Sequence, residues 1–208
     1  MKVLMINGSP NEHGCTYTAL SEVQTVLHRE GIETELLYLG KKPVAGCIDC
    51  GHCREVKKGV CVFDDKVNEI SARLDEFDAI VVGSPVYYSG PSGQVCAFLD
   101  RLFLCNQRRM AGKLGAAVVS CRRGGGTASF ERLNKYFTIA NMMVVGSQYW
   151  NQVHGYSPEE VRQDEEGLQT MRTLGQNMAW LLKCIEAGRA AGIQLPEYEP
   201  LTPTNFIR

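Results

Sequence analysis

Four cysteines between residues 47 and 61 are the most chemically suggestive cluster in the sequence. Cys47, Cys50, Cys53 and Cys61 follow the spacing C-x2-C-x2-C-x7-C. Thiolates at x2 spacing can reach three corners of a [4Fe–4S] cubane while a fourth cysteine arrives after a loop. A structural zinc ion usually takes two separated C-x2-C pairs, and a thiol loop without metal is a third interpretation. The spacing therefore predicts an iron–sulfur site, with zinc and free thiols as alternatives.

The other cysteines carry less information. The chain has 9 cysteines, an odd number, which points away from a disulfide framework and toward metal or redox chemistry. Cys96, Cys105 and Cys184 stand in apolar helical contexts and are predicted to lie in the core. Asp100 and Arg101 are expected to make structural contacts.

A second signal is the polar segment 8–16, which follows the apolar run 3–6 and precedes apolar residues at helical spacing. Strand, glycine-containing loop and helix together aim backbone N–H groups and a helix N-terminus at an anion. Neither a Walker A loop nor G-x-G-x-x-G is present. The hydroxyls of Ser9, Thr16 and Thr18 can instead donate to a phosphate. The alternative is an ordinary strand-to-helix turn capped by Ser or Thr.

Two further loops follow expected strands. Ser84-Pro85-Val86-Tyr87-Tyr88 comes after 78–83, and Ser120-Cys121-Arg122-Arg123-Gly124-Gly125 ends the strand at 114–120. Because ligands of parallel sheets bind outside the carboxyl ends of the strands, the three loops are expected to converge on one crevice. We find no Ser-His-Asp arrangement, paired-carboxylate site or HExxH motif, which agrees with chemistry done by a cofactor.

The elements that position these loops alternate between strands and helices. Strands are predicted at 3–6, 32–39, 78–83, 114–120 and 142–150. Helices are predicted around 19–27, at 67–77, 92–103 and 127–141, and from the capping box at Ser157 to Gly192. Five such units predict an α/β fold with a doubly wound, five-stranded parallel sheet and helices on both faces. We expect one domain over residues 1–208, with a cysteine-rich loop at 41–65 and an extended tail at 193–208.

Composition excludes some classes of function. With 44% hydrophobic and 22% charged residues and a net charge of −1, the chain lacks the basic character of a nucleic-acid binder. It contains no apolar run of membrane-spanning length and no signal-peptide pattern. We therefore expect a cytoplasmic protein with no nucleic-acid or membrane partner.

Taken together, these motifs resemble those of the flavodoxin-like NAD(P)H-dependent FMN reductases, and most closely the iron–sulfur flavoproteins. The resemblance rests on NGSPNEHGCTYTAL, the cysteine motif followed by FDD, GSPVYYSGPSGQVCAFLDR, SCRRGGG and the tail TNFIR. It implies a flavodoxin-like strand order 2-1-3-4-5, FMN as cofactor, NAD(P)H as substrate and a [4Fe–4S] cluster on the four loop cysteines.

The resemblance also implies where FMN binds: its phosphate in the first loop and its isoalloxazine ring between the other two. The implied binding residues are Ser9, Asn11, Cys15, Thr16, Thr18, Ser84, Pro85, Val86, Tyr87, Tyr88, Ser120, Arg122, Arg123, Gly124 and Gly125. Cys15 stands where relatives often have Asn or Ser, so a contact there rests on its backbone N–H. One tyrosine is expected to lie along the ring and one arginine to favour the anionic reduced flavin. The alternatives are a packed loop anchor and a solvated arginine pair.

The implied function is an FMN-dependent oxidoreductase that takes electrons from NAD(P)H at flavin N5, with no catalytic side chain. The acceptor is expected to be the cluster or a small molecule such as a quinone, nitro compound or free flavin. The alternatives are an electron carrier that docks to protein partners without NAD(P)H activity, and a flavin-binding redox sensor. Because the related proteins are typically dimers or tetramers, we expect a homo-oligomer in which the cysteine loop or the tail crosses to a neighbour.

Overall fold

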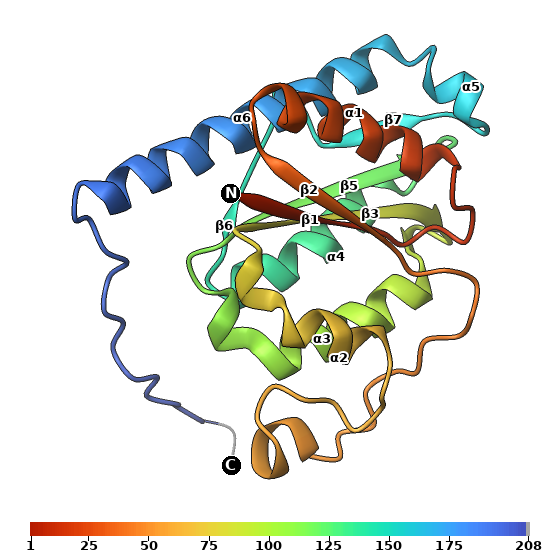
Figure 1. The fold of residues 1–208 in the computed structure, drawn as a ribbon. Coiled ribbons are helices and arrows are strands. Elements are labelled where there is room, and N and C mark those ends of the chain that lie inside the picture. Colours follow the sequence, from red (N-terminus) through yellow and green to blue (C-terminus); the bar gives the residue numbers. More distant parts are fainter. Residues whose placement is uncertain (207–208) are drawn as a thin grey trace.

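The computed structural model describes residues 1–206 and places a parallel sheet between two layers of helices (Figure 1). The strands are β1 (Lys2–Asn7), β2 (Glu33–Tyr38), β3 (Ala79–Tyr87), β4 (Gly90–Pro91), β5 (Leu114–Cys121), β6 (Met143–Val144) and β7 (Gln152–His154). The helices are α1 (Cys15–Arg29), α2 (Lys66–Ala72), α3 (Gly93–Met110), α4 (Gly126–Ile139), α5 (Pro158–Val161) and α6 (Glu165–Ala190). A π-helical turn spans His52–Val56, and a 3-10 turn spans Leu74–Glu76.

The main path of the sheet has the order β2-β1-β3-β5-β6, with neighbouring strands parallel. This confirms the predicted α/β class, with β2 at one edge. Two short strands are additional, since β4 pairs antiparallel with β3 and β7 pairs parallel with β5. Among residues 1–206 the sheet therefore has 7 strands, of which five form the main path and two are short additions.

The prediction of one continuous strand over 142–150 is also wrong. β6 pairs with the start of β5 and β7 with its end. Between them, the Ser147 hydroxyl donates to the Tyr149 carbonyl (2.6 Å) and accepts from the Tyr149 N–H (3.3 Å). Because this turn uses backbone groups that a strand ladder needs, it interrupts the edge of the sheet.

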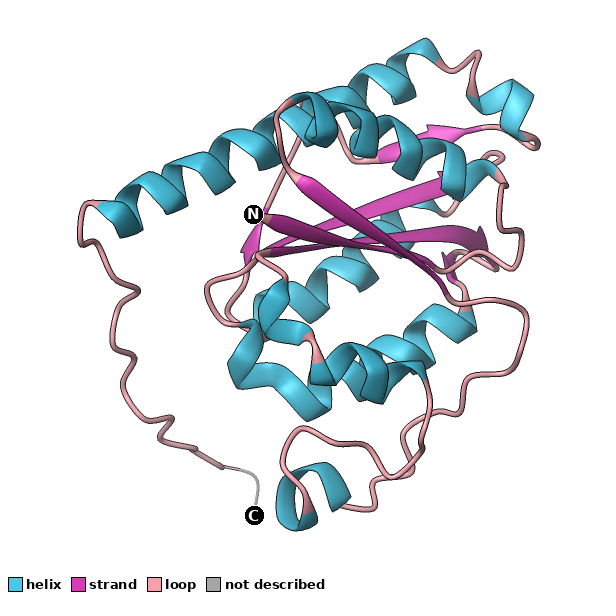
Figure 2. Cartoon of the chain, viewed as in Figure 1, coloured by secondary structure: helices cyan, strands magenta, loops and turns pink. Residues whose placement is uncertain are grey.

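The two faces of the sheet bury different residues of the same strand. Helices α1 and α6 cover one face, and α2, α3 and α4 cover the other (Figure 2). In β1, Val3 and Met5 belong to the core on the α1 side, whereas Leu4 and Ile6 belong to the core on the α3 side. Because both faces are buried, the central strands are continuous apolar runs. Of the strand residues, only the polar ones at the strand ends can then contribute to a site.

The strand β3 is longer than the sequence predicts. It continues through residues 84–87, which we expected to be a loop, and ladders of β3 residues with β5 and with β4 hold this extension. Tyr88 and Ser89 form the turn into β4 with φ values of 49° and 59°. Two central residues with positive φ are typical of the tight hairpin turns that match strand twist. The sequence does not reveal this hairpin, because neither turn position is a glycine, the residue that usually marks a turn with positive φ.

Two predicted helices are shorter than expected. The helix predicted at 67–77 ends at Ala72 and is followed by the 3-10 turn. The helix predicted behind Ser157 is two helices, because Asp164 accepts from the Gly167 N–H and caps α6 separately after α5. In both cases the apolar spacing continues across the break, and at α6 a local side-chain cap marks it.

Gly192 follows the end of α6, as predicted, with a φ of 86°. Residues 193–206 then form neither helix nor strand, and their side chains are exposed. Within the part of the chain that the structure describes, no helix combines the length and the apolar character needed to cross a bilayer.

Candidate functional site

The first loop, residues 8–16, is held in shape by its own polar groups. Asn7 accepts from the Ser9 N–H (3.1 Å) and donates to the Glu12 carbonyl (2.9 Å). The Ser9 hydroxyl accepts from the Asn11 N–H (3.1 Å). Among the bonds described for residues 1–206, the Ser9 hydroxyl proton has no acceptor, so it is available to an anion.

Helix α1 begins directly after this loop with an open N-terminus. Its N-cap is Gly14, no side chain of residues 1–206 caps it, and its first turn holds no acidic residue. The partial positive charge and unpaired N–H groups of such a terminus attract an anion. The Cys15 thiol turns toward the Gly155 carbonyl (3.7 Å). Burial, followed by the nearby Glu160 charge, raises the pKa of that thiol.

Hydrogen bonds join the first loop to both other loops. The Gly8 N–H donates to the Gly83 carbonyl (2.9 Å), at the start of the β3 extension. The hydroxyls of Thr16 and Ser120 lie 2.8 Å apart, and both are buried. The Thr18 hydroxyl, by contrast, donates to the Gly14 carbonyl within the helix (3.2 Å). The structure thus brings the three sequence-predicted loops together, as expected.

The second and third loops are in direct contact at Gly125. Its φ is 88°, and a β-carbon there would lie 2.7 Å from Ser89 Cα and 2.9 Å from Val86 Cγ1. Only glycine combines this conformation with so close an approach. The glycine run that the sequence singled out therefore lets the two loops pack against each other.

The predicted flavin-side residues differ in exposure. Ser84 is buried, and its hydroxyl accepts from the Ser92 N–H (2.9 Å), so it anchors the start of α3. Pro85 and Val86 are half-buried. Exposed side chains and backbone line the rest of the second and third loops, namely those of Tyr87, Tyr88, Arg122, Arg123 and Gly124. Arg122 also borders an open hollow of about 370 Å³ together with Tyr156 and Glu160.

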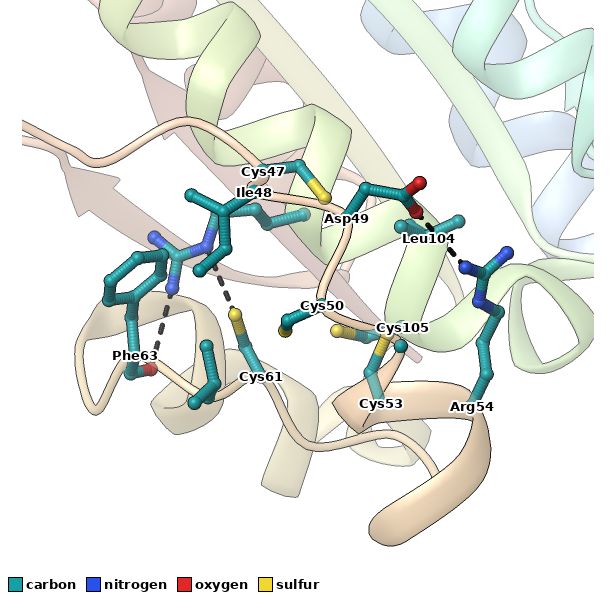
Figure 3. Close-up of a pocket in the computed structure, with 13 residues that line it drawn as sticks. Cys47, Ile48, Asp49, Cys50, Cys53, Arg54, Cys61, Phe63, Leu104 and Cys105 are labelled. Carbon is teal, nitrogen blue, oxygen red and sulfur yellow. Dashed lines mark hydrogen bonds and ion pairs between the residues drawn. The ribbon is translucent and has the colours of Figure 1, made fainter.

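The four predicted metal-ligating cysteines line one pocket, to which α3 contributes Arg101, Leu104 and Cys105 (Figure 3). Cys47 and Cys50 are exposed, and Cys53 and Cys61 are half-buried. Apolar side chains complete the lining, among them Ile48, Val62, Phe63 and Leu104. A single pocket therefore gathers the thiols that the motif predicts.

Cys61 is the most firmly held of these cysteines. Asn68, on α2, accepts from the Cys61 N–H (2.8 Å) and donates to its carbonyl (3.0 Å). Arg101, on α3, donates from Nε to the Cys61 sulfur (3.1 Å). Two helices thus fix the last cysteine of the motif, whereas the first two lie on an exposed loop.

Arg101 contacts several segments of this corner, although the sequence predicts only structural contacts for it. Its side chain is 1% exposed, and its guanidinium makes a bidentate pair with Asp65 (2.7 and 2.9 Å). It also donates to the Ala45 carbonyl (3.2 Å) and stacks over the Phe63 ring (4.9 Å). A positive charge is therefore buried against the cysteine loop, where it favours thiolate sulfur.

The prediction that Cys105 lies in the core is wrong. Cys105 lines the cysteine pocket, with its sulfur beside that of Cys53 (Figure 3). Burial and the interaction with Cys53 raise the pKa of its thiol to about 12. Arg101 and Cys105 are four residues apart on α3 and so share a face. The i, i+4 spacing of these two polar side chains is the feature of the sequence that could have indicated their shared position. Cys184, also predicted to be core, is exposed, whereas Cys96 does pack against the core.

The residue types that line the pocket are those that bind an iron–sulfur cluster. Five thiols line it, together with apolar side chains and a buried guanidinium. Within residues 1–206, however, no three His, Cys, Asp or Glu side chains lie close enough to hold one metal ion. Thiols are the right kind of ligand for a thiolate-bound cluster. In the described residues they lie apart on a loop and do not converge on one point.

Comparison with known proteins agrees with this architecture. The profile of the NADPH-dependent FMN reductase family matches residues 1–156. An iron–sulfur flavoprotein of Methanocaldococcus jannaschii is 36% identical over 196 residues, which cover 89% of this chain and 100% of that protein. One of Methanosarcina thermophila is 29% identical over 193 residues, covering 91% and 99%. An archaeal flavodoxin structure superposes with a TM-score of 0.59 at 18% identity, covering 88% of this chain and 99% of the other. The flavodoxin-like fold expected from the sequence is therefore confirmed.

Proposed function

This chain belongs to the NADPH-dependent FMN reductase family, whose members are FMN-binding flavodoxin-like oxidoreductases, and on that premise we propose that it takes electrons from NAD(P)H through bound FMN. It passes them to a [4Fe–4S] cluster in the cysteine pocket or to a small acceptor such as a quinone, nitro compound or free flavin. The observation that carries the proposal is the meeting of three hydrogen-bonded loops at the open N-terminus of α1.

The phosphate of FMN would lie in the first loop. Its donors would be the Ser9 hydroxyl, the Cys15 backbone N–H and the Thr16 hydroxyl. Asn11 and Thr18 would line the loop, because the Asn11 N–H and the Thr18 hydroxyl already donate within it. Of the donors, Ser9 is best placed, because its proton lacks an acceptor among the described residues. An arrangement of neutral donors around a helix N-terminus binds a phosphate without a lysine.

The isoalloxazine ring would lie between the second and third loops. Residues 84–88 would form one side and Ser120, Arg122, Arg123, Gly124 and Gly125 the other. When bound, FMN supplies the hydride-accepting chemistry, and the protein supplies position and charge. The exposed arginine pair next to Gly125 would offset negative charge on the ring.

Cys47, Cys50, Cys53 and Cys61 would hold the cluster. The pocket that gathers these thiols and the names of the relatives, which are iron–sulfur flavoproteins, both support this assignment. A [4Fe–4S] cluster would supply one-electron transfer. Protein prepared without oxygen is expected to contain about four iron and four sulfide per chain. Cys50→Ala is expected to lose the iron and keep FMN, because the phosphate loop is a different segment.

Steady-state NAD(P)H oxidation with a quinone as acceptor distinguishes an oxidoreductase from an electron carrier. Turnover by the FMN-loaded protein is the expected result. A protein that is inactive with both nicotinamide cofactors, yet fully reduced by a ferredoxin-like donor, would replace this function with the carrier. We further propose a cytoplasmic homo-oligomer, because 9 cysteines, an odd number, point away from a disulfide framework and because the flavin edge in an open crevice needs cover.

A further inference from the structure

The cysteine pocket holds one thiol more than a four-cysteine cluster uses. Cys105 lines it together with Cys47, Cys50, Cys53 and Cys61. In Figure 3 the Cys105 sulfur lies next to that of Cys53, and the two thiols interact. The fifth thiol therefore lies beside one particular cysteine of the motif, Cys53.

The two neighbouring thiols are carried by very different elements. Cys53 belongs to the π-helical turn His52–Val56, in which no residue is buried. Cys105 belongs to α3, whose adjacent residues Leu102, Phe103 and Asn106 are buried. The cysteine loop packs back on this part of α3 near Gly59, whose β-carbon position is 3.9 Å from the Cys105 carbonyl. A thiol on an exposed turn and a thiol on a packed helix thus line the same pocket.

Arg101 places a buried positive charge on the same helix as the Cys105 thiol. It lies one helical turn before Cys105 and donates to the sulfur of Cys61. The same helix face therefore presents a thiol and a buried positive charge to the motif. An anionic thiolate cluster is stabilised by such a charge and by N–H donors to its sulfurs.

We propose that Cys105 is a fifth ligand-forming cysteine of this pocket, which takes the coordination position of Cys53 when Cys53 is displaced or absent. The inference rests on the cluster of the proposed function. In the exchange the iron–sulfur bond to Cys53 breaks and one to Cys105 forms. The proton of the Cys105 thiol would pass to the released Cys53 thiolate, or to solvent where Cys53 is absent, and no electron would move.

The test is the iron and sulfide content of variants reconstituted without oxygen. Cys53→Ala is expected to keep most of the wild-type iron, and Cys105→Ala to keep all of it. The double variant Cys53→Ala/Cys105→Ala is expected to hold at least about tenfold less, because three thiolates remain. The matched control is Cys53→Ala/Cys96→Ala, since Cys96 is a half-buried thiol of α3 outside the pocket. This control should keep as much iron as Cys53→Ala. FMN content of each variant reports that it is folded.

Two results would overturn the inference while leaving the proposed function standing. One is a Cys53→Ala protein as poor in iron as the double variant, and the other is a double variant that retains iron. A wild-type protein that binds FMN but takes up no iron would overturn the inference together with the cluster. It would leave the FMN-dependent reaction to be judged by NAD(P)H oxidation.

Discussion

At the scale of single residues, Arg101 is expected to matter for stability as well as for the pocket. Its guanidinium is buried and paired with Asp65, which is 34% exposed and also caps α2 by accepting from the Val67 N–H. Replacing Arg101 by Met removes these bonds and leaves a carboxylate without its counter-charge. We expect the free energy of unfolding to fall by about 2 to 3 kcal/mol, measured by urea denaturation without cofactors.

A second variant makes this prediction specific. In Arg101→Met/Asp65→Asn the carboxylate is gone, and asparagine still caps a helix well. The double variant should therefore be more stable than Arg101→Met alone. Equal stability of the two, or an Arg101→Met protein as stable as the wild type, would contradict a coupled pair.

Ser9 provides a residue-scale test of the phosphate loop. Removing its hydroxyl in Ser9→Ala takes away a donor to a charged group, so FMN is expected to bind about 1 to 3 kcal/mol more weakly. Riboflavin, which has no phosphate, should bind the variant and the wild type equally. Flavin fluorescence titration measures both. Thr25→Ala is the control, because that α1 hydroxyl donates to the Ser21 carbonyl far from the loop. An equal loss for both flavins would argue against a phosphate contact.

Some of these residues could be predicted from the sequence and others could not. The four motif cysteines and the three loops were found because spacing and strand order are local properties. Arg101 and Cys105 were read as structural because their roles depend on α3 passing under a loop about 40 residues earlier, as the Arg101 bond to Cys61 demonstrates. Hydrophobic spacing reports that a helix face is buried but not what it is buried against.

At the scale of elements, Gly125 sets the distance between the second and third loops. Alanine there would need a positive φ and would bring its β-carbon within 2.7 Å of Ser89 Cα. Gly125→Ala is therefore expected to push the loops apart, to weaken FMN about tenfold or more, and to destabilise the fold by about 1 to 3 kcal/mol. Gly146→Ala, where no described atom lies within 4 Å of the added β-carbon, should change neither quantity. Calorimetry with and without FMN distinguishes the two effects.

The edge strand β2 is tied to the rest of the molecule by charge. Glu35 pairs with Lys2 of β1 (2.8 Å) and with Arg73 (2.7 Å), which follows α2. The Arg73 hydrogen bond, followed by that from Lys2, lowers the pKa of Glu35 to about 2. A depressed pKa adds stability above the unfolded value near 4.5, and this contribution is lost as the pH falls toward 2.

Glu35→Gln should accordingly be less stable than the wild type at pH 7, and the difference should shrink between about pH 4.5 and pH 2. Glu33→Gln, an exposed change on the same strand, controls for the loss of one negative charge. Denaturation curves at several pH values measure both differences. A gap between Glu35→Gln and the wild type that stays constant down to pH 2 would contradict the assigned ion pairs.

Most of the element boundaries follow from apolar spacing, and the errors have local causes. The split of the last strand and the separate cap of α6 arise from local side-chain hydrogen bonds, and the hairpin at Tyr88 arises from two positive φ angles. Such caps and turns depend on individual side-chain bonds and backbone angles, which periodicity averages out. The order of the parallel strands was expected from the resemblance to flavodoxin-like proteins, whereas alternating strands and helices predicted only the α/β class.

At the scale of the whole molecule, the tail beyond α6 is the feature that a single chain leaves unexplained. Leu201 and Phe206 are 90% and 88% exposed, and Ile193 and Tyr198 are exposed as well. Apolar side chains gathered on an extended segment are stabilised when another surface covers them. A second copy of this chain is the partner we expect, with the tail lying across its neighbour.

Light scattering should therefore give the wild type a mass that is a multiple of 23.0 kDa. Deleting residues 196–208 removes most of the apolar tail without touching the sheet or any proposed FMN contact. We expect the deleted protein to dissociate at concentrations where the wild type remains assembled, and to bind FMN less tightly if the neighbour covers the flavin edge. Circular dichroism on the same samples checks that the fold is intact. A wild-type monomer that retains full FMN occupancy would refute this assembly, because the open crevice would then need no second chain.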